Sequence, residues 1–97
     1  MTHKVNKEAA ESMAIQALSF IAEESERLGR FLALSGIDPA SIRSAAADPN
    51  FLVGVLDYVV GDETLVVEFA KTHGFAPEAL IAARAALAGR SAQEEQA

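Results

Sequence analysis

Residues 51–60 read FLVGVLDYVV, a run in which apolar side chains cover almost the whole circumference of a helix. A helix of this kind is buried in a protein core. Asp48-Pro49 before the run supplies an N-cap and a proline for the first turn, and Gly61 after it marks an end. The run contains Asp57 and is far shorter than the roughly 20 residues that a membrane span needs. The sequence therefore predicts a buried central helix and no membrane contact.

The same pattern occurs earlier in the chain. Residues 13–47 align with residues 51–85 without a gap, and the apolar classes agree along most of the alignment. Self-similarity of this kind indicates that one structural unit is used twice. The identities that carry the alignment are Leu18/Leu56, Phe31/Phe69, Gly36/Gly74 and Pro39/Pro77.

Helix signals divide the chain into about six short helices. All 3 prolines fall where a helix can begin, and glycines follow most of the expected ends. No segment alternates like a strand, so we expect an all-α fold. We predict one helical domain over residues 6–89, a compact pseudo-twofold bundle of two tandem three-helix units at about 7–47 and 49–88. A flexible N-terminus, residues 1–5, and a disordered acidic tail, residues 90–97, would flank it.

The expected helices begin and end at particular residues. The first is expected over Lys7–Glu24 with Asn6 as its cap, the second from a Ser25 cap to Gly36, the third over Pro39–Ala47, the fourth from Asp48-Pro49 to about Val60, the fifth from an Asp62 cap to Gly74, and the sixth from Pro77 to Gly89.

Each long apolar helix carries one narrow polar stripe. The two helices are therefore expected to pack together, and the slimmer second stripe predicts a groove at Gly54, Asp57 and Gly61. Gly29 and Gly54 lie inside helices, where glycine costs about 1 kcal/mol relative to alanine. A neighbouring helix that approaches closely would explain them. The stripes are Ser12, Gln16, Ser19 and Glu23 in the first helix, and Asn50, Gly54, Asp57 and Gly61 in the second.

Composition limits the function classes. A chain of 97 residues makes one domain, and the absence of cysteine excludes disulfides and thiolate chemistry. With 8 Lys and Arg against 14 Asp and Glu, the net charge of −6 disfavours nucleic acid and anionic lipid. The start, MTHKVNKEAA, lacks the apolar core of a signal peptide, so we expect a cytoplasmic protein.

No set of residues suggests a catalytic or metal site. His3 lies near the terminus, and His73 falls in the last turn of a helix, where it suits the final carbonyls. Asp57 and Glu63 could serve an acidic hydrolase or isomerase, but no nucleophile or substrate-fixing group accompanies them. We expect a non-enzymatic protein with no catalytic, cofactor-binding or metal-binding residues and no cofactor.

A helix-turn-helix outline is present in residues 30–47, RFLALSGIDPASIRSAAA. A small DNA-binding regulator that uses the Pro39–Ala47 corner is therefore an alternative function. Reading DNA takes several cations, and this region offers only a weak basic patch of Arg27, Arg30 and Arg43. Binding of nucleic acid is therefore not favoured.

The large apolar residues of the second unit favour a protein-protein interaction or adaptor module. If they are too numerous to be buried internally, the excess forms a surface for a protein partner or for a homodimer. Core packing is the competing interpretation for most of them. The residues of this possible surface are Phe51, Leu52, Val55, Val59, Leu65, Val66 and Phe69.

Three segments together carry a family resemblance: RFLALSGIDP, FLVGVLDYVVGDE and FAPEAL. Over about residues 14–89 the chain resembles a family of short all-helical bacterial proteins catalogued as a domain of unknown function. The resemblance implies a helical fold. It implies no activity, cofactor or partner.

Overall fold

The computed structural model describes residues 6–96, with side chains through residue 88, and within this range it is all-α. The predicted fold class is confirmed. The elements are α1 (Lys7–Ala22), α2 (Ser25–Ser35), a short 3-10 turn η1 (Pro39–Ser41), α3 (Ile42–Ala45), α4 (Pro49–Val60), α5 (Glu63–His73) and α6 (Pro77–Gln96).

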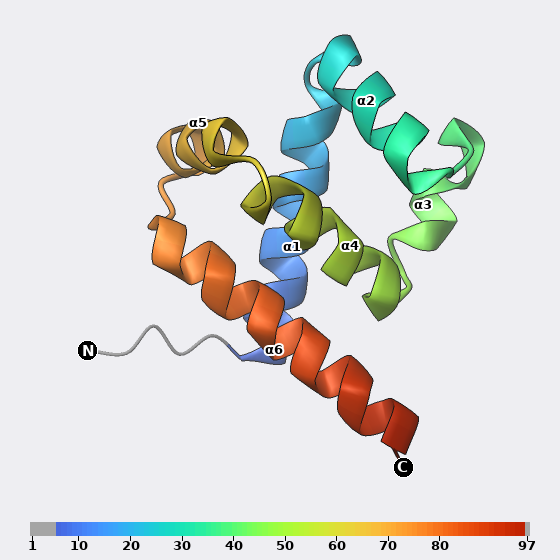
Figure 1. Ribbon diagram of the computed structural model, residues 1–97, viewed down its shortest axis with the longest axis vertical. Helices are drawn as coiled ribbons and strands as arrows, with labels where there is room; N and C mark the ends of the chain where they lie inside the picture. Colours follow the sequence, from blue (N-terminus) through green and yellow to red (C-terminus); the bar gives the residue numbers. More distant parts are fainter. Residues whose placement is uncertain (1–5, 97) are drawn as a thin grey trace.

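Three helices form the core. Figure 1 shows α4 and α6 crossing over α1, with α5 on one side of the bundle and α2 and α3 on the other. Each of the three central helices packs on the other two, α2 packs on α1, and α5 packs on α4 and α6. The buried side chains of the central helices are Ala10, Met13, Ala14, Ala17, Leu18, Phe20 and Ile21 from α1, Leu52, Val55, Leu56 and Val59 from α4, and Leu80, Ala83 and Leu87 from α6.

Side-chain caps set the helix starts, as the sequence predicts. The Asn6 side chain accepts a hydrogen bond from the Ala9 backbone N–H at 2.8 Å, and Asp48 and Asp62 cap α4 and α5 in the same way. This satisfies N–H groups that the first turn of a helix leaves without an intrahelical partner. The start of α2 differs from the prediction, because Glu24 is its N-cap residue and Ser25 is already helical.

Glycine ends two helices where the backbone turns left-handed. Gly36 after α2 has φ 72° and Gly74 after α5 has φ 74°, a conformation that strains residues with a Cβ. Both corners lead to a proline that starts the next element, so the aligned segments share their local geometry here.

The third helices of the two aligned segments differ, however. Pro39–Ser41 and Ile42–Ala45 form two short pieces, and the first unit therefore has no continuous helix over Pro39–Ala47. The corresponding α6 is long and supplies three buried side chains to the core. The core is thus not shared equally between the two segments, and the tandem repeat stays a prediction of the sequence.

The last helix extends beyond the predicted end. α6 continues through Gly89 to Gln96, because a glycine lowers helix stability without forbidding the helix. Residues 90–96 of the predicted tail thus fall within α6. Residue 97 and the predicted N-terminal segment 1–5 lie outside the described residues.

The two glycines inside helices do not mark close helix contacts. A Cβ placed on Gly29 or Gly54 would meet no heavy atom within 4 Å, leaving aside the helix's own backbone. Both residues are exposed, because the core lies on the other side of their helices. The predicted close approach at these positions is therefore wrong.

Among the described residues, no helix is long and apolar enough to cross a membrane.

Neighbouring residues on α6 allow a matched test of the core. Leu80 is fully buried whereas Ile81 is 57% exposed. We expect Leu80→Ala to lower the free energy of unfolding by about 2–5 kcal/mol, because it leaves a cavity between the central helices. Ile81→Ala should change it by less than about 0.5 kcal/mol. Urea unfolding followed by circular dichroism measures both, and equal losses would contradict the observed packing of α6.

Candidate interaction groove

A hollow of about 440 Å³ lies between α2 and α4. We call it the α2–α4 groove. Its volume falls within the range of roughly 300–1,000 Å³ that is typical of ligand pockets. The lining residues are Phe31, Leu34 and Ser35 from α2, and Asn50, Phe51, Gly54, Asp57 and Tyr58 from α4.

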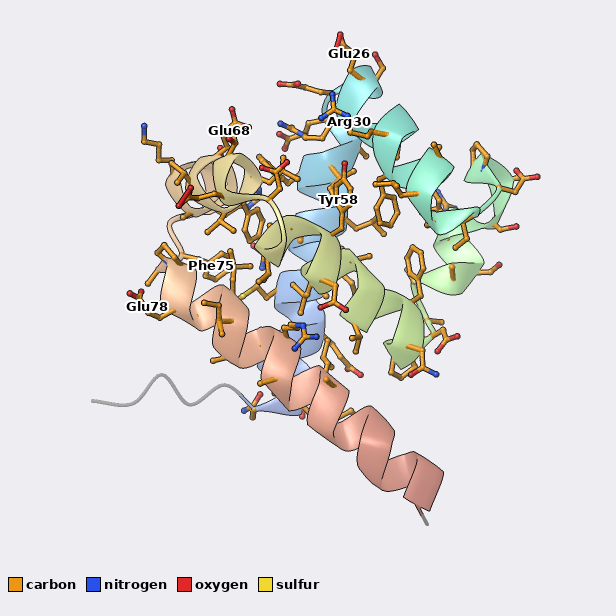
Figure 2. The ribbon with its side chains drawn as sticks, viewed as in Figure 1. Glu26, Arg30, Tyr58, Glu68, Phe75 and Glu78 are labelled. Carbon is orange, nitrogen blue, oxygen red and sulfur yellow. The ribbon has the colours of Figure 1, made fainter. Side chains whose placement is uncertain are left out.

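Aromatic rings form the walls of the groove. Phe31 is 3% exposed, and its ring meets Phe51 and Tyr58 edge-on, with ring centroids 6.0 and 5.2 Å apart. Edge-to-face contacts of this kind add to the stabilisation that comes from burial. Figure 2 shows Tyr58 extending from α4 into the space beside α2. The walls are therefore held in place by a buried ring.

The absence of a side chain at Gly54 explains why the groove is hollow. Phe51, Gly54 and Tyr58 fall on one face of α4, since residues three, four and seven apart share a face of a helix. Gly54 lies between the two aromatic residues, and a Cβ added to it would meet no heavy atom within 4 Å. The space that a side chain would fill is left open.

The rim of the groove combines one apolar and one charged side chain. Leu34 is 73% exposed, the highest value among the exposed large apolar residues of the described chain. Asp57 is the only charged residue in the lining, and its carboxylate accepts a hydrogen bond from the Arg84 guanidinium of α6. Asp57 is thus an exposed, paired carboxylate and not a buried one.

The structure brings together part of the groove that the sequence indicates. Gly54 and Asp57 line it, whereas Gly61 caps the end of α4 and lies outside the lining. Sequence reasoning missed Phe31, Leu34, Ser35 and Tyr58 as lining residues. The pairing of α2 with α4 that brings them together is not visible in either helix alone.

Most of the predicted apolar surface lies in the core instead. Of its residues, Phe51 and Val66 are half-buried, and only Phe51 reaches the groove. The others are covered by the contacts of α4 and α5 with the neighbouring helices. These buried residues are Leu52, Val55, Val59, Leu65 and Phe69.

Arg27 serves as a tie between helices. Its guanidinium carbon lies 3.9 Å from the centroid of the Phe20 ring, and Nη2 donates to the Phe20 carbonyl oxygen at 2.7 Å. Nη1 lies 3.5 Å from the Glu68 carboxylate and 3.6 Å from that of Glu24. The Arg27 side chain is 11% exposed, so it joins α1, α2 and α5 and is not free to bind a phosphate.

Arg30 and Arg43, the other two members of the predicted basic patch, lie on different helices. Arg30 is exposed on α2, where Figure 2 shows it near Glu26. Arg43 lies on the single turn α3, beyond the Gly36 corner. Arg43 is the only basic residue of η1 and α3.

The other candidate residues have local structural roles or stand apart. His73 ends α5 with its ring centroid 4.7 Å from that of Phe69 and 6.2 Å from that of Phe20. Glu63 is exposed in the first turn of α5, a favourable place for a carboxylate. Among the described residues, no group of three or more His, Cys, Asp or Glu side chains could hold a metal ion.

Comparison with known proteins places the chain in a family. A family model described as a protein of unknown function, DUF3572, matches residues 7–90. The chain belongs to the DUF3572 family. The match includes every lining residue of the α2–α4 groove, so the groove lies within the DUF3572 domain. It confirms the resemblance noted in the sequence and brings no activity with it. Searches of curated proteins and of solved structures found no match.

Replacing Arg27 tests its role as a tie. We expect Arg27→Ala to lower the free energy of unfolding by about 1–3 kcal/mol, because it removes the stacking on Phe20, the packing of the side-chain stem and the hydrogen bond to a carbonyl. Arg30→Ala, an exposed change on the same helix, should cost less than about 0.5 kcal/mol. Urea unfolding measures both, and equal effects would rule out a special role for Arg27.

Two glycine substitutions should act in opposite directions. Gly54→Ala should raise the free energy of unfolding by about 0.5–1 kcal/mol, because alanine is the better helix former and its methyl group has room. Gly36→Ala should lower it by about 1–2 kcal/mol, because φ there is 72°. Thermal and urea unfolding give the signs. A destabilised Gly54→Ala variant would contradict the open space at this position.

Proposed function

We propose that the protein is a non-enzymatic interaction module and that its α2–α4 groove receives the apolar face of a helix from a protein partner. The observation that carries this proposal is Leu34, an exposed leucine at the rim of an apolar, aromatic-walled hollow. Removing such a side chain from water on binding is favourable. Exposed apolar surface around a concavity is typical of interaction sites.

The shape of the groove supports a helix as the occupant. Two helices form its walls, and an amphipathic helix laid between such walls is a recurrent mode of peptide recognition. Phe51 and Tyr58 are only half-buried, so a partner side chain placed over Gly54 would contact both rings. Aromatic residues in such pockets contribute strongly to binding energies.

The groove offers little for catalysis. Asp57 is the only charged side chain in its lining, and Arg84 already pairs with it. Catalysis by a carboxylate needs a second group to activate a nucleophile or to bind the reacting atoms. A binding role needs only the apolar and aromatic side chains that already line the groove.

The DNA-binding alternative has less support than the groove. Arg27 is committed to contacts within the chain, and the expected recognition helix is divided into two short pieces. The net charge of −6 opposes approach to phosphates.

A selection experiment tests the proposal. A library of displayed amphipathic helices is selected on the wild-type protein, and the enriched helices are then assayed on variants. We expect Leu34→Asp and Gly54→Leu to weaken binding more than about tenfold, because one places a charge on the apolar rim and the other fills the hollow. Ile81→Asp, an exposed apolar residue outside the lining, is the matched control and should bind like wild type.

Two results would overturn the proposal. In the first, every enriched helix binds Leu34→Asp as tightly as it binds wild type, although circular dichroism shows that the Leu34→Asp variant is folded. The other is a wild-type protein that forms dimers in sedimentation experiments while Leu34→Asp is a monomer. In that second case a copy of the same chain occupies the groove.

A further inference from the structure

The charged edge of the α2–α4 groove indicates what kind of helix fits it. The guanidinium Nε of Arg84 on α6 donates to Oδ1 of Asp57 on α4. The Asp57 and Arg84 side chains are 47% and 44% exposed. The pair therefore sits at the surface, in contact with water, and only Asp57 lines the groove.

Covering the groove changes the surroundings of Asp57. A helix laid over Phe51 and Tyr58 would exclude water from the neighbouring carboxylate. A carboxylate that loses water needs compensating hydrogen bonds or charges. The two carboxylate oxygens of Asp57 have about four acceptor positions, and the hydrogen bond from Arg84 uses only Oδ1. Asp57 can therefore accept a second donor.

We infer that the partner helix carries a lysine or arginine about one helical turn from its apolar anchor and that Asp57 recognises this cation. The inference rests on the proposed function of the groove and names the partner's chemistry. Asp57 follows Gly54 by three positions on α4, so the two residues lie slightly less than one helical turn apart, about 4.5 Å along the axis. A lysine or arginine one helical turn from the partner's apolar anchor would therefore reach the Asp57 carboxylate.

The charge of the whole protein favours the same partner. A chain with net charge −6 attracts basic partners and repels acidic ones, and it also opposes pairing with its own copy. Arg84 does not cancel this preference, because an exposed ion pair is weak.

The experiment uses a helix enriched on the groove and its variants with the basic residue changed to glutamine. Binding is measured by fluorescence anisotropy on the full chain. On wild type, we expect the change from lysine to glutamine to weaken binding about threefold to tenfold. On Asp57→Asn the two peptides should bind equally. On Arg84→Gln the preference for lysine should grow, because Asp57 then lacks its internal partner.

A matched control separates local recognition from total charge. Glu78→Gln removes one negative charge, as Asp57→Asn does, but from the first turn of α6. Figure 2 shows Glu78 beside Phe75 and away from Tyr58. It should keep the lysine preference of wild type. Raising the salt concentration should reduce the preference on wild type and leave Asp57→Asn unaffected.

The outcomes distinguish this inference from the proposed function. If Leu34-dependent helices carry no basic residue at this spacing, the inference is overturned and the groove remains a binding site. The same holds if the lysine preference is equal on wild type and Asp57→Asn. If no enriched helix depends on Leu34, the proposed function fails and the inference fails with it.

Discussion

The packing of α4 against both α1 and α6 is the constraint on which the rest of the structure depends. One side of α4 supplies Leu52, Val55, Leu56 and Val59 to the core, and these side chains are buried against the two other central helices. The part of the α4 surface that the core leaves exposed is a narrow strip that contains Gly54 and its neighbours on the same face. The groove can form only along this strip, so the core decides where it lies. One wall of the groove is therefore the exposed face of α4.

The second wall of the groove depends on fewer contacts. Phe31 is the buried residue of α2. Near the start of the helix, Arg27 joins α2 to α1 and α5 through its contacts with Phe20 and Glu68. Phe31 and the largely buried Arg27 side chain, together with the half-buried Leu28 and Leu32, therefore position α2. A lysine could not replace this arginine, because it has no planar group to stack on a ring while donating hydrogen bonds in several directions.

Local signals in the sequence predict most of the fold, and the missing parts depend on tertiary packing. The caps at Asn6 and Asp62 and the left-handed glycines were predictable, because each follows from the chemistry of a few adjacent residues. The length of α6 was not predictable, since glycine commonly ends a helix but a helix can also continue through it, as α6 does at Gly89. In the groove, Gly54 and Asp57 were predictable from their polar stripe. Leu34 was not, because nothing within α2 shows which of its apolar side chains the core leaves exposed.

The sequence also could not show which of the large apolar residues of the second segment are buried. A helix that is apolar all round has no face that periodicity can assign to the core. The third helix of the second segment resolves the ambiguity, because α6 supplies Leu80, Ala83 and Leu87 and covers side chains that would otherwise be exposed. With the core closed in this way, an exposed Leu34 beside an uncovered glycine is not left over from incomplete packing. It belongs to a face of the molecule that the core does not use, so substitutions there leave the packing between α1, α4 and α6 intact.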